Sequence, residues 1–250
     1  MLSNKKYAGI FLAIVIASLF IIISLLGMQF LSGTIWFLFS SALRIVFGFI
    51  ILFIVKGIYG TPIKKTLSLK GSKMALIAGS GFVLFFLYYI ILWCSGIESI
   101  KGITTGILIS RIIFQQIATG FYEELNYRLL ILEGYFYGPR NIKNKLMYGF
   151  ISFLLFAAVH IVDSWSTSRF LLAGVIGFAF ATMYLKSRNI VIPMILHFLY
   201  DVLANLADYI EWNNSTLFAN MNSISDISLI IMFAVSVIVL LKKEKTIKEM

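Results

Sequence analysis

Long apolar runs recur along the whole of this chain, and they leave few folds open to it. They reach the about 17–25 residues that a helix needs to cross the hydrocarbon core of a bilayer. Of the 250 residues, 60% are hydrophobic and 13% are charged, whereas soluble domains average roughly 45–50% and about 25%. The sequence therefore predicts an all-α fold, a polytopic membrane helical bundle that forms a single domain over residues 1–250.

About eight transmembrane helices are expected, and the Lys and Arg residues between them predict their orientation. Connections that contain many Lys and Arg residues alternate along the chain with connections that contain few. This alternation is typical of a multi-pass protein with its N- and C-termini in the cytoplasm. The net charge is +10, and the basic residues that produce it lie at the ends of the apolar runs. They therefore indicate orientation in a cell membrane, and no nucleic-acid partner is expected. The expected spans are 7–28, 35–55, 74–94, 104–132, 146–162, 169–186, 190–208 and 226–241.

Charged residues interrupt the apolar run at 121–130. A charge at the centre of a bilayer costs at least ~2.5–3.5 kcal/mol on insertion scales, so such residues are functional candidates. Glu124 and Arg128 are four residues apart and share a helix face, where they can form an ion pair that is either structural or part of a site. Glu123 is rotated from that pair by about 100° and needs another partner.

Both histidines of the chain, His160 and His197, lie within predicted spans. His197 shares a helix face with Asp201, four residues further on. Positions 123 and 160 are symmetric about the connection between their spans, so Glu123 and His160 are expected at similar depth. His197 lies closer to its own cytoplasmic connection, and straight helices would displace it by roughly 13 Å.

These residues form three motifs in order on separate spans: Glu123-Glu124-x-x-x-Arg128, Phe156-x-x-x-His160 and His197-x-x-x-Asp201. In this order and context they resemble the CPBP family of intramembrane endopeptidases (CAAX protease and bacteriocin-processing, or Abi). The resemblance covers residues 100–207, which would form the catalytic core. Residues 1–99 would add N-terminal transmembrane helices that match the family only in being membrane helices.

The resemblance implies an enzyme, a protease that hydrolyses a peptide bond within the membrane. By carry-over, Glu123 is the general base on a water that His160 helps to position. His197 and Asp201 support the oxyanion, and Glu124 with Arg128 orients the site. The expected partners are the lipid bilayer and a peptide or membrane-protein substrate, cleaved near the cytoplasmic leaflet. The resemblance to bacterial members of the family implies that this protein processes a bacteriocin or another peptide, or provides self-immunity.

Two questions remain open at this level. No cofactor is expected, but Glu123, His160 and His197 also have the ligand count of a catalytic zinc site with one open position. The alternative function is a non-catalytic immunity or partner-binding membrane protein that keeps the motifs as structure. A transporter with a proton relay is disfavoured, because the sequence has no inverted repeat and no pair of interrupted spans.

Overall fold

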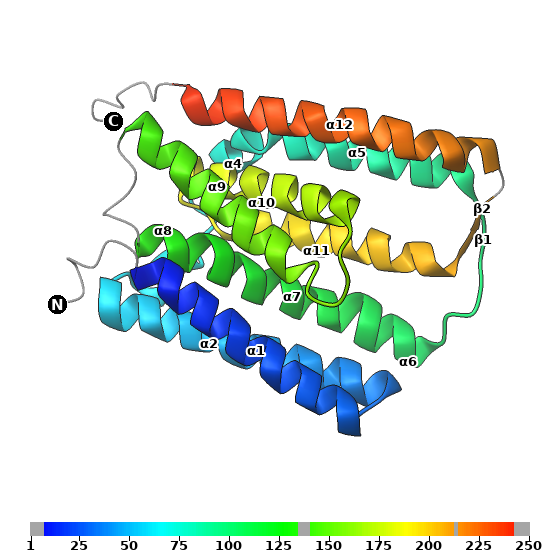
Figure 1. Ribbon diagram of the computed structural model, residues 1–250, viewed down its shortest axis with the longest axis horizontal. Helices are drawn as coiled ribbons and strands as arrows, with labels where there is room; N and C mark the ends of the chain where they lie inside the picture. Colours follow the sequence, from blue (N-terminus) through cyan, green and yellow to red (C-terminus); the bar gives the residue numbers. More distant parts are fainter. Residues whose placement is uncertain (1–7, 135–140, 213–214, 243–250) are drawn as a thin grey trace.

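The computed structural model describes residues 8–134, 141–212 and 215–242, and its helices run along the long axis of an elongated bundle (Figure 1). One face is formed by α1 and α2, the opposite face by α5 and α12, and the remaining long helices lie between them. The predicted all-α membrane bundle is therefore confirmed. The long elements are α1 (Ala8–Phe30), α2 (Gly33–Tyr59), α5 (Ser80–Gly96), α9 (Ile142–Val159), α10 (Thr167–Ser187), α11 (Val191–Leu206) and α12 (Ser215–Leu241).

Within the described residues, five helices are long and apolar enough to cross a membrane, and a bent pair can supply a sixth. The five are α1, α2, α9, α10 and the segment Val191–Tyr209. The predicted spans 104–132 and 226–241 are also helical, but π-helical turns interrupt the first. The described apolar part of the second, Ile227–Leu241, is shorter than a full span.

The span predicted at 74–94 is helical but bent. The short α4 (Ser72–Ala78) meets α5 at a bend of 76°. Gly79 lies at this bend, and a side chain there would collide with Met183 of α10. At the bend the chain therefore packs closely against the Met183 side chain of α10.

The helix that carries Glu123 is continuous but irregular. It consists of α6 (Thr105–Ile107), η1 (Leu108–Phe114), α7 (Gln115–Glu124), η2 (Leu125–Leu130) and α8 (Ile131–Glu133), where η1 and η2 are π-helical. π turns alter the backbone hydrogen bonding, and polar groups at membrane depth need other partners. The Ser152 hydroxyl of α9 donates to the Tyr127 carbonyl at 3.1 Å, and the Asn126 side chain donates to the Ala13 carbonyl at 3.1 Å. η2 is thereby held between α9 and α1.

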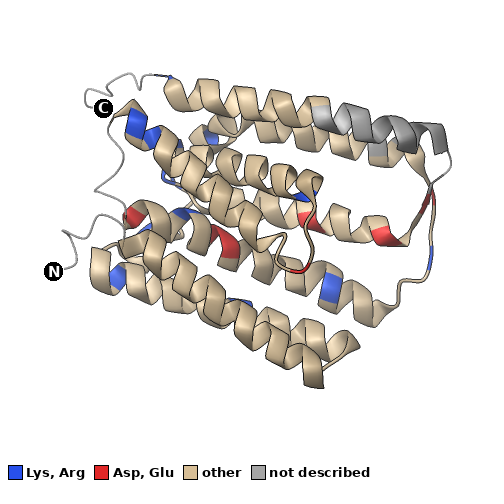
Figure 2. Cartoon of the chain, in the orientation of Figure 1, with Lys and Arg blue, Asp and Glu red and all other residues tan. Residues whose placement is uncertain are grey.

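The basic connections meet at one end of the bundle, the end where α1 begins and α12 ends (Figure 2). Asn189 donates to the carbonyls of Ser68 and Lys70 at 3.2 and 3.0 Å, and the Lys186 ammonium donates to the Lys242 carbonyl at 2.8 Å. Segments expected on one side of the bilayer therefore lie together. This end is called the basic end below.

A small antiparallel sheet marks the opposite end. β1 (Ile97–Ile100) pairs with β2 (Ile210–Trp212) and joins the connection after α5 to the connection after α11. Beside it, the Arg111 guanidinium contacts the Asp208 carboxylate at 2.7 Å. The pairing ties α5, α11 and the irregular helix together on the side away from the basic end.

Candidate active site

A close approach of two helices brings the polar residues together. Gly120 of α7 faces α11, where a Cβ atom would lie 2.9 Å from the Met194 carbonyl oxygen and 3.7 Å from Cβ of His197. Without a side chain at this position the two backbones can meet. Glu123 and Glu124, one turn further along α7, then reach the His197 ring.

Gly120→Ala is expected to destabilise the folded protein by about 1–3 kcal/mol, because the added methyl group overpacks the α7–α11 contact. The matched control is Gly57→Ala in α2, where a Cβ atom would meet nothing within 4 Å. Alanine favours an exposed helix interior by about 1 kcal/mol over glycine, so the control is expected to be neutral or stabilising. Thermal unfolding in detergent measures both. Equal stabilisation by the two substitutions would contradict the close approach.

His197 lies among three carboxylates. Its Nδ1 atom is 2.8 Å from Glu124 Oε1, and its Nε2 atom is 3.3 Å from Asp201 Oδ2 and 3.7 Å from Glu123 Oε2. The imidazole is 3% exposed, and Glu123 and Asp201 are only slightly more open. The ring therefore links both adjacent glutamates of α7 to the aspartate of its own helix.

Arg128 lies next to this cluster. Its side chain is fully buried, and so is the side chain of Glu124. The predicted ion pair is confirmed, with Arg128 Nε 3.2 Å from Glu124 Oε2. The contact lacks the alignment of a hydrogen bond. The guanidinium carbon lies 4.2 Å from the centre of the Phe156 ring and 5.5 Å from that of Phe180. Desolvated cation–π contacts of this kind are worth about 2 kcal/mol or more.

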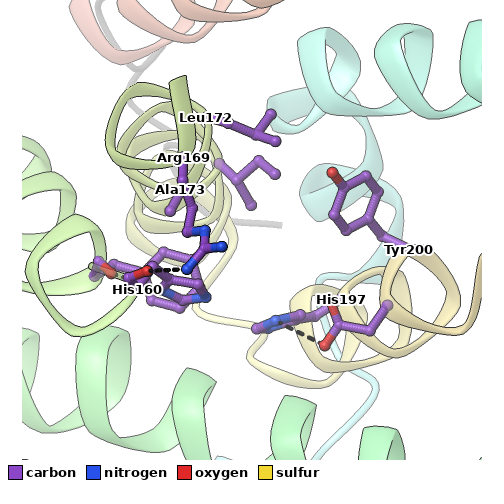
Figure 3. A pocket seen from close by; sticks show the side chains of 9 residues that line it. His160, Arg169, Leu172, Ala173, His197 and Tyr200 are labelled. Atoms are coloured by element: carbon purple, nitrogen blue, oxygen red, sulfur yellow. Dashed lines mark hydrogen bonds and ion pairs between the residues drawn. The ribbon is translucent and has the colours of Figure 1, made fainter. Parts of the chain in front are cut away.

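His160 ends α9 and lies on the far wall of a pocket from His197 (Figure 3). Its Nδ1 atom bonds the Phe156 carbonyl oxygen at 2.7 Å, and its ring lies 4.4 Å from the Phe156 ring. Within the described part of the chain, the imidazole does not pair with Glu123. His160 therefore borders the same space as His197 without joining the carboxylate cluster.

The predicted depths are wrong for His197. Its contact with Glu123 shows that no 13 Å displacement separates them. The expectation assumed that the connection between the fourth and fifth spans is centred near 141.5, whereas α8 ends at Glu133 and α9 begins at Ile142. Glu123 is ten positions from the end of its helix and His197 six positions into α11, which differ by roughly 6 Å.

The pocket has a volume of about 120 Å³, room for several water molecules. It is lined by Phe156 and by His160, His197 and Asp201 of the predicted site. Sequence reasoning missed the rest of its wall, since nothing local to α10 marks it as facing α11. The missed lining residues are Arg169, Leu172, Ala173, Ile176 and Tyr200.

An ion pair lies at the mouth of this pocket. Arg169 Nη1 is 3.1 Å from Asp163 Oδ1, and Nη1 also lies 3.5 Å from the His160 carbonyl oxygen. Partial desolvation opposes ionisation of Asp163, but its backbone hydrogen bonds and the Arg169 charge outweigh it. The pKa of the Asp163 carboxyl therefore lies below its usual value. The Asp163 carboxyl therefore stays ionised at neutral pH.

The alternative zinc site is not assembled in this arrangement. Among the described residues, no group of three or more His, Cys, Asp or Glu side chains is placed to hold a metal ion. Glu123, His160 and His197 thus do not form a three-ligand set here.

The fold and this cluster define a helical membrane protein with a carboxylate–histidine site beside a pocket. Residues 105–203 match the family described as Type II CAAX prenyl endopeptidase Rce1-like. This match confirms the resemblance that the three motifs predict, and at the level of the family it supports a CAAX-type intramembrane protease. It covers less than half of the chain and leaves out α1, α2, α4, α5 and α12. No curated protein and no solved structure gives a significant match.

Proposed function

We propose that this protein is an intramembrane endopeptidase in which Glu123 activates a water molecule. The observation that carries the proposal is the cluster of Glu123, His197 and Asp201 beside a pocket large enough for water, within the segment that matches the family. Three ionisable groups at membrane depth are costly to retain unless they act on something. The proposed location is a cell membrane, with both termini in the cytoplasm.

In the proposed reaction, Glu123 accepts a proton from water while the water oxygen attacks the carbonyl carbon of the peptide bond. The proton then passes to the leaving amide nitrogen, and the C–N bond breaks. General-base catalysis of this kind contributes about 10²–10⁴-fold. His160, on the opposite wall of the pocket, is placed to position the water.

The remaining residues hold the oxyanion donor. In this proposal His197 carries a proton on both ring nitrogens: Nδ1–H donates to Glu124, and Nε2–H is directed toward Glu123, Asp201 and the pocket. Oxyanion donors in sites that exclude water contribute about 10²–10³-fold each. Asp201 then orients the His197 ring, and Arg128 holds the Glu124 carboxylate in place. This arrangement gives Asp201 a role without requiring it to donate a hydrogen bond itself.

We further propose that the reaction needs no metal ion, in keeping with the dispersed positions of the three potential zinc ligands. Metal analysis of the purified protein, together with a chelator test, checks this. Activity that requires stoichiometric zinc would overturn it.

The substrate is proposed to be a peptide or membrane-anchored protein, as in bacteriocin or peptide processing or self-immunity. The name of the matched family refers to prenylated substrates, and matched peptides with and without a prenyl group would test that requirement. The alternative is a non-catalytic immunity or partner-binding protein. A transporter is less well supported, because the described residues contain one bent helix pair and not a symmetric pair of broken helices.

Glu123→Gln is expected to lower processing at least ~10²-fold, because the amide keeps the shape of the side chain but cannot act as a base. Mass spectrometry of new N-termini, in membranes that contain the wild type or the variant, measures the effect and identifies substrates. Glu98→Gln on exposed β1 is the matched control and is expected to process normally. Unchanged processing by both Glu123→Gln and His160→Ala, in protein that still inserts, would favour the non-catalytic alternative.

A further inference from the structure

α2 lies outside the segment that matches the family, yet it packs against α7 of the candidate site. The Gln115 side chain of α7 donates to the Ser40 hydroxyl of α2 at 3.4 Å. Further along both helices, a Cβ atom on Gly48 would lie 2.3 Å from a carbon of the Phe121 ring. Arg44 is four residues from Ser40 and four from Gly48, so it lies on the same face of α2. That face is turned toward α7.

Arg44 lies near the middle of the membrane-spanning length of α2. It is 11 positions from the first residue of the helix, Gly33, and 15 from the last, Tyr59. These separations correspond to roughly 16 and 22 Å along a helix, and half of the hydrocarbon core is about 15 Å thick. An arginine at this depth is costly and is a candidate for a functional role.

The direct contacts of the Arg44 guanidinium do not neutralise its charge. Its Nη1 atom donates to the Ser40 hydroxyl and, at 3.3 Å, to the Ser40 carbonyl oxygen. Its central carbon lies 4.8 Å from the centre of the Phe20 ring, and its buried Nε atom has no hydrogen-bond partner among the described residues. The strongest favourable electrostatic interaction of the guanidinium is with the Glu123 carboxylate, and Asp201 also attracts it. The counter-charge of Arg44 is therefore in the cluster around His197.

This cluster has room for one more positive charge. Glu123, Glu124 and Asp201 each place a carboxylate near the His197 ring. Among the described residues in direct contact with them, Arg128 and the doubly protonated His197 of the proposed mechanism supply two positive charges. One negative charge is then left over at membrane depth, where an unbalanced charge is costly.

We propose that Arg44 is the third cation of the candidate site and balances the charge of the carboxylate cluster, so that Glu123 can serve as a base. Arg44 acts through Glu123 and is therefore a positioning residue. Its effect on processing rests on the proposed function, whereas the charge balance is a separate property of the folded protein. The proposal extends the site to α2, which contains none of the three motifs.

Loss of this cation is expected to change how processing depends on pH. Without the Arg44 charge the cluster restores its balance by taking up a proton, and a protonated Glu123 cannot act as a base. Removal of an opposite charge moves protonation of a carboxyl to higher pH, so the acid limb of the processing profile should move up by about one pH unit or more. The charged and titratable groups around Glu123 are Arg44 of α2, His197 and Asp201 of α11, and Tyr122, Glu124, Tyr127 and Arg128 of its own irregular helix.

The pH profile of processing by Arg44→Met tests the role at the site. At low pH its loss of processing should approach the ~10²-fold loss expected for Glu123→Gln, and it should recover as the pH rises. Arg44→Lys retains the charge and is expected to keep the acid limb of the wild type. Arg111→Met is the matched control, because it removes a cation that contacts Asp208 near the small sheet. Its acid limb is expected to stay unchanged.

A double-variant cycle tests the charge balance without any measurement of activity. Asp201→Asn keeps the shape of the side chain and removes one carboxylate charge, so the remaining charges balance without Arg44. Arg44→Met should therefore lower the unfolding temperature in detergent much more in the wild-type background than in the Asp201→Asn background. If Arg44→Met alone does not fold, recovery of folded protein on addition of Asp201→Asn gives the same answer.

Equal losses of unfolding temperature in the two backgrounds would overturn the charge balance, because Arg44 would then act through its packing alone. A wild-type acid limb in Arg44→Met, or a displaced one in Arg44→Lys, would overturn its role at the site. Normal processing by Glu123→Gln would instead remove the proposed function, and the unfolding temperatures would still decide the charge balance.

Discussion

Arg128→Met is expected to lower the free energy of unfolding by about 3–5 kcal/mol, the range for breaking a buried ion pair by removing one partner. The Glu124 carboxylate would remain fully buried with its charge offset only by His197. The contacts of the guanidinium with Phe156 and Phe180 would also be lost. Thermal unfolding of the protein in detergent measures the change.

A double variant separates the charge from the packing. Glu124→Gln together with Arg128→Met removes both charges and keeps the side-chain volumes close to the originals. Replacing a whole buried ion pair is often close to neutral, so the double variant is expected to be more stable than Arg128→Met alone. If the two unfold at the same temperature, lost packing on the aromatic rings and not the unpaired carboxylate is the cause.

His197→Ala is expected to reduce both stability and processing. Glu124 would lose its 2.8 Å hydrogen bond, and hydrogen bonds to charged groups are worth about 1.5–3 kcal/mol. Without the imidazole the oxyanion would lose its donor, so processing should fall at least ~10²-fold. Unfolding temperature and the yield of new N-termini, measured on the same preparation, report the two effects.

His160→Ala provides the contrast. His160 is half-buried, and among the described residues its ring bonds only the Phe156 carbonyl. The substitution should therefore lower processing with a smaller loss of stability than His197→Ala. The two substitutions are thus expected to differ in their effect on protein stability but to lower processing alike. Equal destabilisation by both substitutions would show that His160 is mainly structural and would remove it from the proposed site.

Much of the candidate site could be predicted because its pairs are local. Glu124 with Arg128 and His197 with Asp201 are each four residues apart, and the helical repeat alone places such residues on one face. Both contacts are present, at 3.2 and 3.3 Å. The roles of these residues in catalysis remain predictions.

The contact between Glu124 and His197 could not be predicted in the same way. It joins residues 73 positions apart, and it depends on the rotation and depth of α7 against α11. Those are decided by the close approach at Gly120 and by the lengths of the connections, neither of which periodicity reports. The same limit explains the missed pocket wall of Arg169 and Tyr200, and the unexpected bend at Gly79.

By itself, the sequence determined that the chain is a bundle of membrane helices, which connections share a side, and which polar residues share a helix face. These follow from the length of apolar runs, the distribution of charge and the 3.6-residue repeat, all of which are local. Only the tertiary structure decided that His197 lies among three carboxylates and that His160 borders the pocket instead of pairing with Glu123. Helices in lipid pack through the fit of their surfaces, and that fit depends on all the neighbouring helices together.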